Sequence, residues 1–137
     1  MKIDSREIFE QIGNLFYAVA IEQHIKPLEL GEMKLLIRQR WMPRNFEEYQ
    51  SIVTDETHLI LMTMDMLRSD EVSAHHAFNQ FARFYSIYPE VFTQELKQHI
   101  LDTCLEFTRI FHADNPLDNI ILIELKALFD NVKTNAQ

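Results

Sequence analysis

Apolar residues recur every three or four positions along most of the chain, which is the spacing of one face of an α-helix. The first such stripe runs through Ile8, Phe9, Ile12, Leu15 and Phe16. No window shows the sustained alternation of apolar and polar residues that is typical of a half-buried strand. The pattern therefore predicts an all-α chain. The helices are expected over residues 5–24, 28–41, 45–68, 71–88, 93–111 and 116–132.

Prolines and glycines refine this picture. Pro27 suits the first turn of the second helix, and Pro43 disfavours helical geometry in the residue before it, which ends that helix. No Gly/Ser-rich or Pro-rich linker divides the chain, so we expect a single helical domain over residues 1–137, a compact bundle of about six helices.

Gly13 lies inside the first helix at a cost of about 1 kcal/mol relative to Ala, which predicts a close helix contact there. Residues 59–67 are apolar on most sides and are expected to form the most enclosed helical segment.

Composition excludes several function classes. Hydrophobic residues make up 47% of the chain, which excludes a disordered protein, and 2 Gly with 4 Pro are too few for an all-β fold. Gly13 and Gly31 cannot supply a Gly-rich phosphate loop or a nucleophile elbow. Cys104 is the only cysteine, so no disulfide forms within the chain, and its apolar neighbours predict a buried, unreactive thiol. We therefore expect a non-enzymatic protein without catalytic residues.

The formal net charge of −8 repels phosphate backbones and disfavours nucleic-acid binding. One basic cluster exists, and we interpret it as a solvated helix face. Its members are Lys34, Arg38, Arg40 and Arg44. The charged N-terminus has no apolar signal-peptide core, and no run of 18 uncharged apolar residues predicts a transmembrane helix. A cytoplasmic location is the expectation that follows.

A faint internal repeat relates residues 14–36 to residues 106–128. Glu22 aligns with Asp114, and Glu32 aligns with Glu124. Each copy reads as a helix end, a turn with an acid and an amide, and a new helix that carries a Glu. If the two pseudo-repeated hairpins pair about a two-fold axis, these four carboxylates converge, and converging oxygens suit Ca²⁺ or Mg²⁺. The alternative is that the acids only cap turns, where Asp, Asn and Glu are common.

The same two turns resemble the TerB-like helical domain associated with tellurite resistance. The residues that carry the resemblance are Ala18-Val19-Ala20-Ile21-Glu22-Gln23 with Glu29 or Glu32 and Leu36, and Ile110-Phe111-His112-Ala113-Asp114-Asn115 with Glu124. Glu22 stands where that family usually has Asp, and Gln23 and Asn115 stand where it has Gly. The resemblance implies a helical fold, a divalent cation on the acidic residues, and a role in stress response or in scaffolding at a membrane surface rather than a defined reaction.

Three functional hypotheses follow from these observations. The first is a TerB-like interaction or scaffold domain that binds a protein partner or a second copy of itself. The second is a metal-binding protein that uses Glu22, Glu32, Asp114 and Glu124. The third is a carrier of a small ligand or lipid, with a pocket lined by the aromatic stripe. That stripe comprises Phe78, Phe81, Phe84, Tyr85 and Tyr88.

Two further patterns bear on metal binding and on partner binding. Glu71/His75 and Glu95/His99 are i,i+4 pairs that can each present two metal ligands from one helix face, although such pairs are common on surfaces. Phe84 lies off the main stripe of its helix and Trp41 lies at a helix end. Exposed aromatic residues at these places would suit a protein partner.

Overall fold

A computed structural model of the chain describes the backbone of residues 5–41, 46–111 and 119–135 and the side chains of residues 6–41, 56–111 and 119–130. Its described residues form six α-helices and one short 3₁₀-helix, which confirms the predicted all-α fold class. The elements are α1 Ser5–Glu22, α2 Pro27–Trp41, α3 Phe46–Ser69, α4 Ala74–Ile87, η1 Pro89–Val91, α5 Gln94–Ile110 and α6 Ile120–Asn135.

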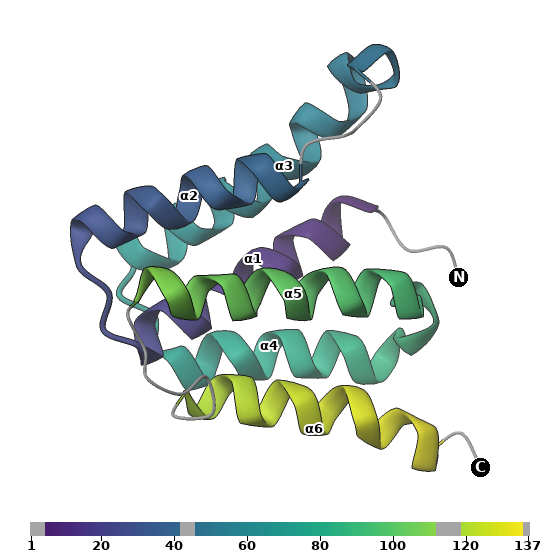
Figure 1. The fold of residues 1–137 in the computed structure, drawn as a ribbon. Coiled ribbons are helices and arrows are strands. Elements are labelled where there is room, and N and C mark those ends of the chain that lie inside the picture. The colour runs from purple at the N-terminus through teal and green to yellow at the C-terminus, as the bar shows by residue number, and fades with distance from the viewer. Residues whose placement is uncertain (1–4, 42–45, 112–118, 136–137) are drawn as a thin grey trace.

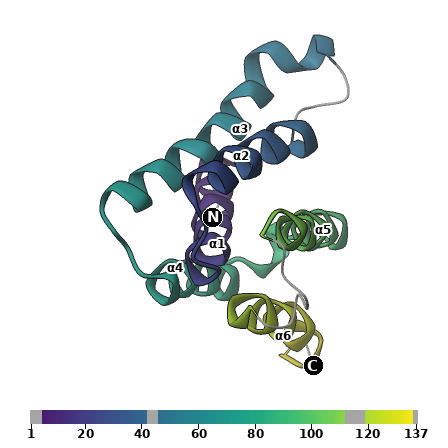
Figure 2. The same ribbon diagram turned by 60° about the vertical axis from the view of Figure 1, so that its left-hand side comes forward.

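Helix α1 lies at the centre of the arrangement (Figures 1 and 2). It packs chiefly against α3 and α4, and it also contacts α5 and α6. Helices α2 and α3 run side by side and lead away from the body that α1, α4, α5 and α6 form (Figures 1 and 2). We call this pair of helices the α2–α3 arm. Its helices are held to the body by α3 against α1 and by α2 against α5.

The burial of α1 corrects one expectation. Six consecutive residues of α1, from Leu15 to Ala20, are buried, because neighbouring helices cover this helix on several sides. In contrast, Met62 and Met66 on α3 are 48% and 60% exposed. The prediction that residues 59–67 form the most enclosed segment is therefore wrong. One face of α3 packs on α1, and the two exposed methionines share the open side with polar residues such as His58 and Asp65.

The predicted close contact at Gly13 is confirmed. A Cβ atom on Gly13 would lie 2.8 Å from Cβ of Thr63 and 2.9 Å from the carbonyl oxygen of Ile60. Both atoms belong to α3, and carbon atoms in van der Waals contact normally keep about 3.5–4.0 Å apart. Glycine at this position thus allows the backbones of α1 and α3 to approach closely, which offsets its poor helix propensity.

The ends of α1 and α3 share one geometry. His24 and Glu71 follow these helices with φ of 54° and 53°, in the left-handed region. Each is followed by an apolar residue whose N–H donates back into the helix, Ile25 to the Ala20 carbonyl and Val72 to the Leu67 carbonyl. These are Schellman-type C-caps, formed here without glycine.

The aromatic side chains pack against one another inside the bundle. The ring of Phe92 lies edge-on to Phe81, and the ring of Phe129 packs on Tyr85 at 5.2 Å between centroids. Phe84 and Trp41 are each only 8% exposed, so the expectation that they are surface aromatics is wrong. Trp41 is buried because α5 covers the end of α2. The expected pocket-lining stripe is largely core.

Candidate functional site

The structure places three of the four predicted metal-binding acids. Glu22 is the last residue of α1 and is partly buried, Glu32 is exposed on α2, and Glu124 lies on α6. Asp114 falls outside the described residues. Within the described part of the chain, no three His, Cys, Asp or Glu side chains lie close enough together to hold one metal ion. Glu22, Glu32 and Glu124 therefore do not form such a group by themselves, and the four-acid site stays a prediction.

Glu124 has one unusual feature. Its Oε2 atom is buried and has no hydrogen-bond partner among the described residues. A buried carboxylate oxygen without a donor is costly, because it has lost its water without gaining a replacement. This oxygen is chemically suited to a cation, and it is the one observation here that fits the predicted metal site.

Asn119 joins the two predicted hairpins. Its side-chain oxygen caps α6 by accepting from the N–H groups of Ile121 and Leu122. Its amide nitrogen donates to the carbonyl oxygen of Val19 at 3.1 Å and to Oε1 of Gln23 at 2.9 Å, both at the end of α1. Helix α1 of the first hairpin packs on α6 of the second, and α2 packs on α5. Helices α1 and α2 pack on other helices more than on each other, so the paired hairpins stay a prediction.

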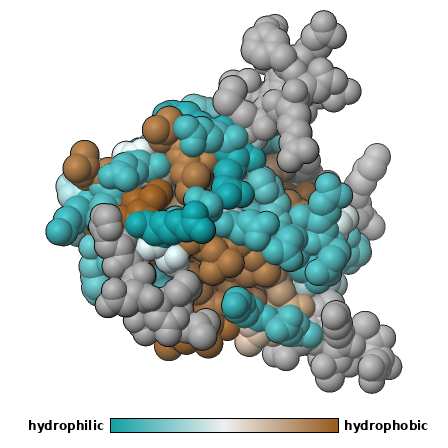
Figure 3. All heavy atoms as spheres, viewed as in Figure 1, coloured by the Kyte–Doolittle hydropathy of each residue, from teal (hydrophilic) through white to brown (hydrophobic). Residues whose placement is uncertain are grey.

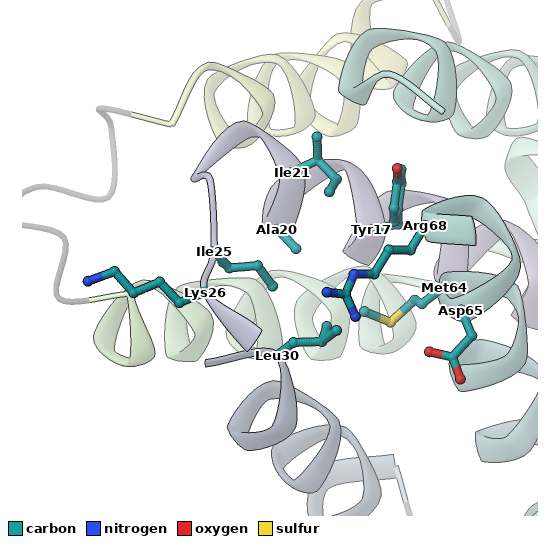
Figure 4. Close-up of a pocket in the computed structure, with 9 residues that line it drawn as sticks. All are labelled: Tyr17, Ala20, Ile21, Ile25, Lys26, Leu30, Met64, Asp65 and Arg68. Carbon is teal, nitrogen blue, oxygen red and sulfur yellow. The ribbon is translucent and has the colours of Figure 1, made fainter. Parts of the chain in front are cut away.

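A small cavity of about 40 Å³ lies where α1 ends, α2 begins and α3 ends (Figure 4). We call it the corner cavity. Its lining combines apolar and charged side chains. The apolar members are Ala20, Ile21, Ile25, Leu30 and Met64, and the polar members are Tyr17, Lys26, Asp65 and Arg68.

The polar groups of the corner cavity differ in their partners. The Tyr17 hydroxyl donates to the carbonyl oxygen of Val72 at 2.5 Å. Burial raises the pKa of Tyr17, and the nearby Arg68 charge opposes that shift. Asp65 is paired with Lys34, whose Nζ lies 2.6 Å from the carboxylate. No hydrogen bond or ion pair joins the Arg68 guanidinium to another described residue.

The outer side of α2 is the second candidate site. Apolar residues are spread almost evenly around this helix. Leu30, Met33, Ile37 and Trp41 are buried against the body, whereas Leu28 and Leu35 are 79% and 54% exposed on the opposite side. Figure 3 shows the resulting hydrophobic surface over α2, with another along the lower edge of α5.

The other candidates have ordinary structural roles. Lys34 pairs with Asp65, and Arg40 pairs with Glu106 at 3.0 Å, while Arg38 is exposed and Arg44 falls outside the described residues. The basic cluster is thus partly neutralised within the fold.

The two Glu–His pairs do not gather further ligands. Glu71 and His75 are both exposed, and Glu95 is exposed beside a partly buried His99. Neither pair belongs to a group of three ligands in the residues that the structure covers. The ring of His99 instead packs against Trp41, with 4.2 Å between ring centroids and 40° between the ring planes.

Cys104 is fully buried in α5, as the sequence predicts. Burial raises the pKa of its thiol far above the ordinary value, because the apolar surroundings disfavour the thiolate. A thiol in this state is neither a nucleophile nor a metal ligand.

Two residues of the candidate sites were not singled out by the sequence. Arg68 is one of several charged residues near the end of α3, and nothing in its spacing marks it as facing a cavity. Asn119 did carry a signal, since an Asn directly before the apolar run of residues 120–123 is a typical N-cap. The predicted helix start at residue 116 does not use that signal.

No family model, curated protein or solved structure matches the chain. In the described residues, no helix has both the length and the apolar character needed to cross a membrane.

Proposed function

We propose that this chain is a non-enzymatic helical interaction domain that associates with a second copy of itself through the outer side of α2. The observation that supports it is the distribution of apolar residues on α2. A surface helix normally has one apolar face, which packs on the core, and one polar face. Helix α2 has apolar residues on both sides, although only one side is covered.

The outer side of α2 is suited to close helix packing. Leu28 and Leu35 are seven residues apart, which is two turns, so they lie on one line along the helix. Gly31 lies between them, and a Cβ added there would meet no atom within 4 Å. The surface between the two leucines is therefore flat and open. A second helix can approach this surface closely and bury Leu35.

The charges of α2 favour a second copy in the antiparallel direction. Glu32 and Arg38 are both exposed, and each lies three residues from Leu35. When two α2 helices pair antiparallel about Leu35, Glu32 of one helix lies at the same height as Arg38 of the other. One Glu32–Arg38 pair then lies on each side of Leu35. These two pairs fix the direction and the register of the helix pairing.

The resemblance to TerB-like domains places this association in a broader role. The resemblance suggests a cytoplasmic protein with a role in stress response or in scaffolding at a membrane surface. Self-association through α2 fits such a role, because a dimer presents two copies of every other surface to a partner.

Analytical ultracentrifugation of the purified protein tests the proposal. We expect a concentration-dependent dimer, which Leu35→Glu converts to a monomer because a buried, unpaired carboxylate disfavours the interface. Ile87→Glu is the matched control, since Ile87 is 58% exposed on α4, close to the 54% of Leu35, but lies far from α2 along the chain. A wild-type protein that stays monomeric over the whole concentration range would refute self-association.

A second candidate function, binding of a divalent cation, is favoured by the partnerless buried oxygen of Glu124. The ligands would be Glu22, Glu32, Asp114 and Glu124, and a bound Ca²⁺ or Mg²⁺ would supply the charge that this oxygen lacks. The cation would then join the turns of the two hairpins.

Thermal unfolding with added Ca²⁺ or Mg²⁺ tests this candidate. We expect either ion to raise the Tm of the wild-type protein, and Asp114→Asn to weaken ion binding by tenfold or more. Asp130→Asn serves as the control, since Asp130 is exposed on α6 and is not among the predicted ligands. Equal ion responses of the wild type and Asp114→Asn would exclude the four-acid site.

A further inference from the structure

The corner cavity carries an inference that does not depend on self-association or on metal binding. Its inner wall is apolar, since Ala20, Leu30 and Met64 are all buried. Ile21 and Ile25 complete this wall from the end of α1 and the turn that follows. The wall is built by two helix ends that the left-handed residues His24 and Glu71 terminate, so the cavity is a fixed product of the fold.

The size of the cavity limits its occupant. A space that holds one water has about 10–15 Å³ in the same measure. A cavity of about 40 Å³ therefore holds roughly three or four atoms of methyl or water size. This corresponds to a short branched alkyl group and excludes a long lipid chain or an aromatic ring.

Charged side chains of both signs surround the cavity, since Lys26, Asp65 and Arg68 line it and Glu71 lies close enough to Tyr17 to help raise its pKa. Figure 4 shows the Arg68 guanidinium extending over the apolar side chains, whereas the Asp65 carboxylate points away from them and Lys26 points outward. Asp65 is already paired with Lys34. Arg68 has no partner among the described residues, and it lies over the cavity in a chain whose net charge is −8.

Backbone groups do not cancel the Arg68 charge locally. Several carbonyl groups in the last turns of α1 and α3 accept hydrogen bonds within their own C-caps, from Gln23, His24 and Ile25 and from Asp70, Glu71 and Val72. The Tyr17 hydroxyl is committed to the Val72 carbonyl. The guanidinium of Arg68 is thus the group that is available to a ligand at this place.

We propose that the corner cavity binds a small free carboxylate with a short branched apolar chain. The chain fills the space between Ile25, Leu30 and Met64, and the carboxylate pairs with the Arg68 guanidinium, whose planar fork matches two carboxylate oxygens. The proposed ligand is a free small molecule, since a cavity of about 40 Å³ accepts only its short alkyl chain beside the carboxylate.

NMR titration of the ¹⁵N-labelled full chain with sodium isovalerate tests the proposal. We expect saturable shifts for the amides of Ala20, Ile25, Leu30 and Arg68. Across acetate, propionate, butyrate and isovalerate, affinity should rise about fourfold per buried carbon. It should stop rising at longer chains such as octanoate, because the cavity is then full.

Two variants and two further probes complete the test. Arg68→Gln should weaken isovalerate binding at least tenfold, whereas Arg83→Gln, at an exposed site on α4, should leave it unchanged. Isovaleramide, which lacks the charge, should bind at least tenfold more weakly than isovalerate. Equal binding of the amide and the acid, or no saturable shift with any acid, would overturn the proposal. If N-acetylleucine bound tenfold more tightly than isovalerate, the claim of a free small-molecule ligand would fail. The cavity would then be assigned to the carboxyl terminus of a polypeptide.

Discussion

Gly13 on α1 and Thr63 on α3 mark a close approach of two helices, with only 2.8 Å between a Cβ placed on the glycine and the Cβ of the threonine. Gly13→Ala should therefore destabilise the protein by about 1–2 kcal/mol, because the cost of overpacking exceeds the gain in helix propensity. Urea unfolding measures the change.

Gly31 provides the matched control for Gly13. It is also a helical glycine, but a Cβ there meets nothing within 4 Å. Gly31→Ala should stabilise the protein by about 0.5–1 kcal/mol in the same urea experiment, run at one low protein concentration. If both alanine variants shifted stability in the same direction, the close contact at Gly13 would not be the reason for its glycine.

Asn119 is expected to contribute more to stability than an ordinary N-cap, because its amide also holds the end of α1. Asn119→Ala should cost about 2–3 kcal/mol, from the lost cap and from the Val19 carbonyl that it leaves buried without this donor. Thr93→Ala removes the exposed cap of α5 and should cost only about 1 kcal/mol. Equal losses in urea unfolding would show that the link between α6 and α1 contributes little.

Loss of the hydroxyl group should change the stability of the protein in opposite directions at the two buried tyrosines, Tyr17 and Tyr85. Tyr17→Phe removes the hydrogen bond to the Val72 carbonyl and should destabilise the protein by about 1–2 kcal/mol. The Tyr85 hydroxyl is buried without a partner among the described residues. Tyr85→Phe should therefore be neutral or stabilising by up to about 1 kcal/mol, which differential scanning calorimetry resolves.

Cys104 gives the stability of the protein a predictable dependence on pH. The pKa of its thiol is raised in the folded state, so the unfolded chain loses this proton first as the pH rises. The contribution of this thiol to the free energy of unfolding is complete below its pKa in the unfolded chain, near 9.0. Above that pH the free energy of unfolding falls, by about 1.4 kcal/mol at about pH 10. Cys104→Ala should lack this part of the decline between about pH 8 and about pH 10. Parallel declines of the two proteins would contradict the buried neutral thiol.

Much of the fold follows from the spacing of apolar residues. The stripe through Ala77, Phe78 and Phe81 is buried as expected, and α4 begins and ends within a few residues of its predicted bounds. Helix α3 is predicted over 45–68 and is observed over Phe46–Ser69. Local periodicity is sufficient here because each helix buries one face against its neighbours.

The errors arise where tertiary packing decides. Spacing along a helix shows that residues 59–67 are apolar, but it cannot show that α1 receives more covering helices than α3. The same reason explains Trp41, which lies at a helix end and is covered by side chains of α1 and α5. Arg68 illustrates the problem for the candidate site, since its role depends on a cavity formed by three helix ends that are distant in sequence.

Trp41 is the only tryptophan in the chain, and its place gives the protein a built-in optical reporter. Its indole N–H donates to Thr103 on α5 at 3.1 Å, and its ring packs against Phe9 and Phe16 of α1. Trp41 thus belongs to the α2–α3 arm but is surrounded by side chains of the body. Any separation of the arm from the body exposes the indole to water and shifts its emission to longer wavelengths, even while every helix remains folded. The fluorescence of this protein therefore measures docking of the arm, whereas circular dichroism measures the helices themselves.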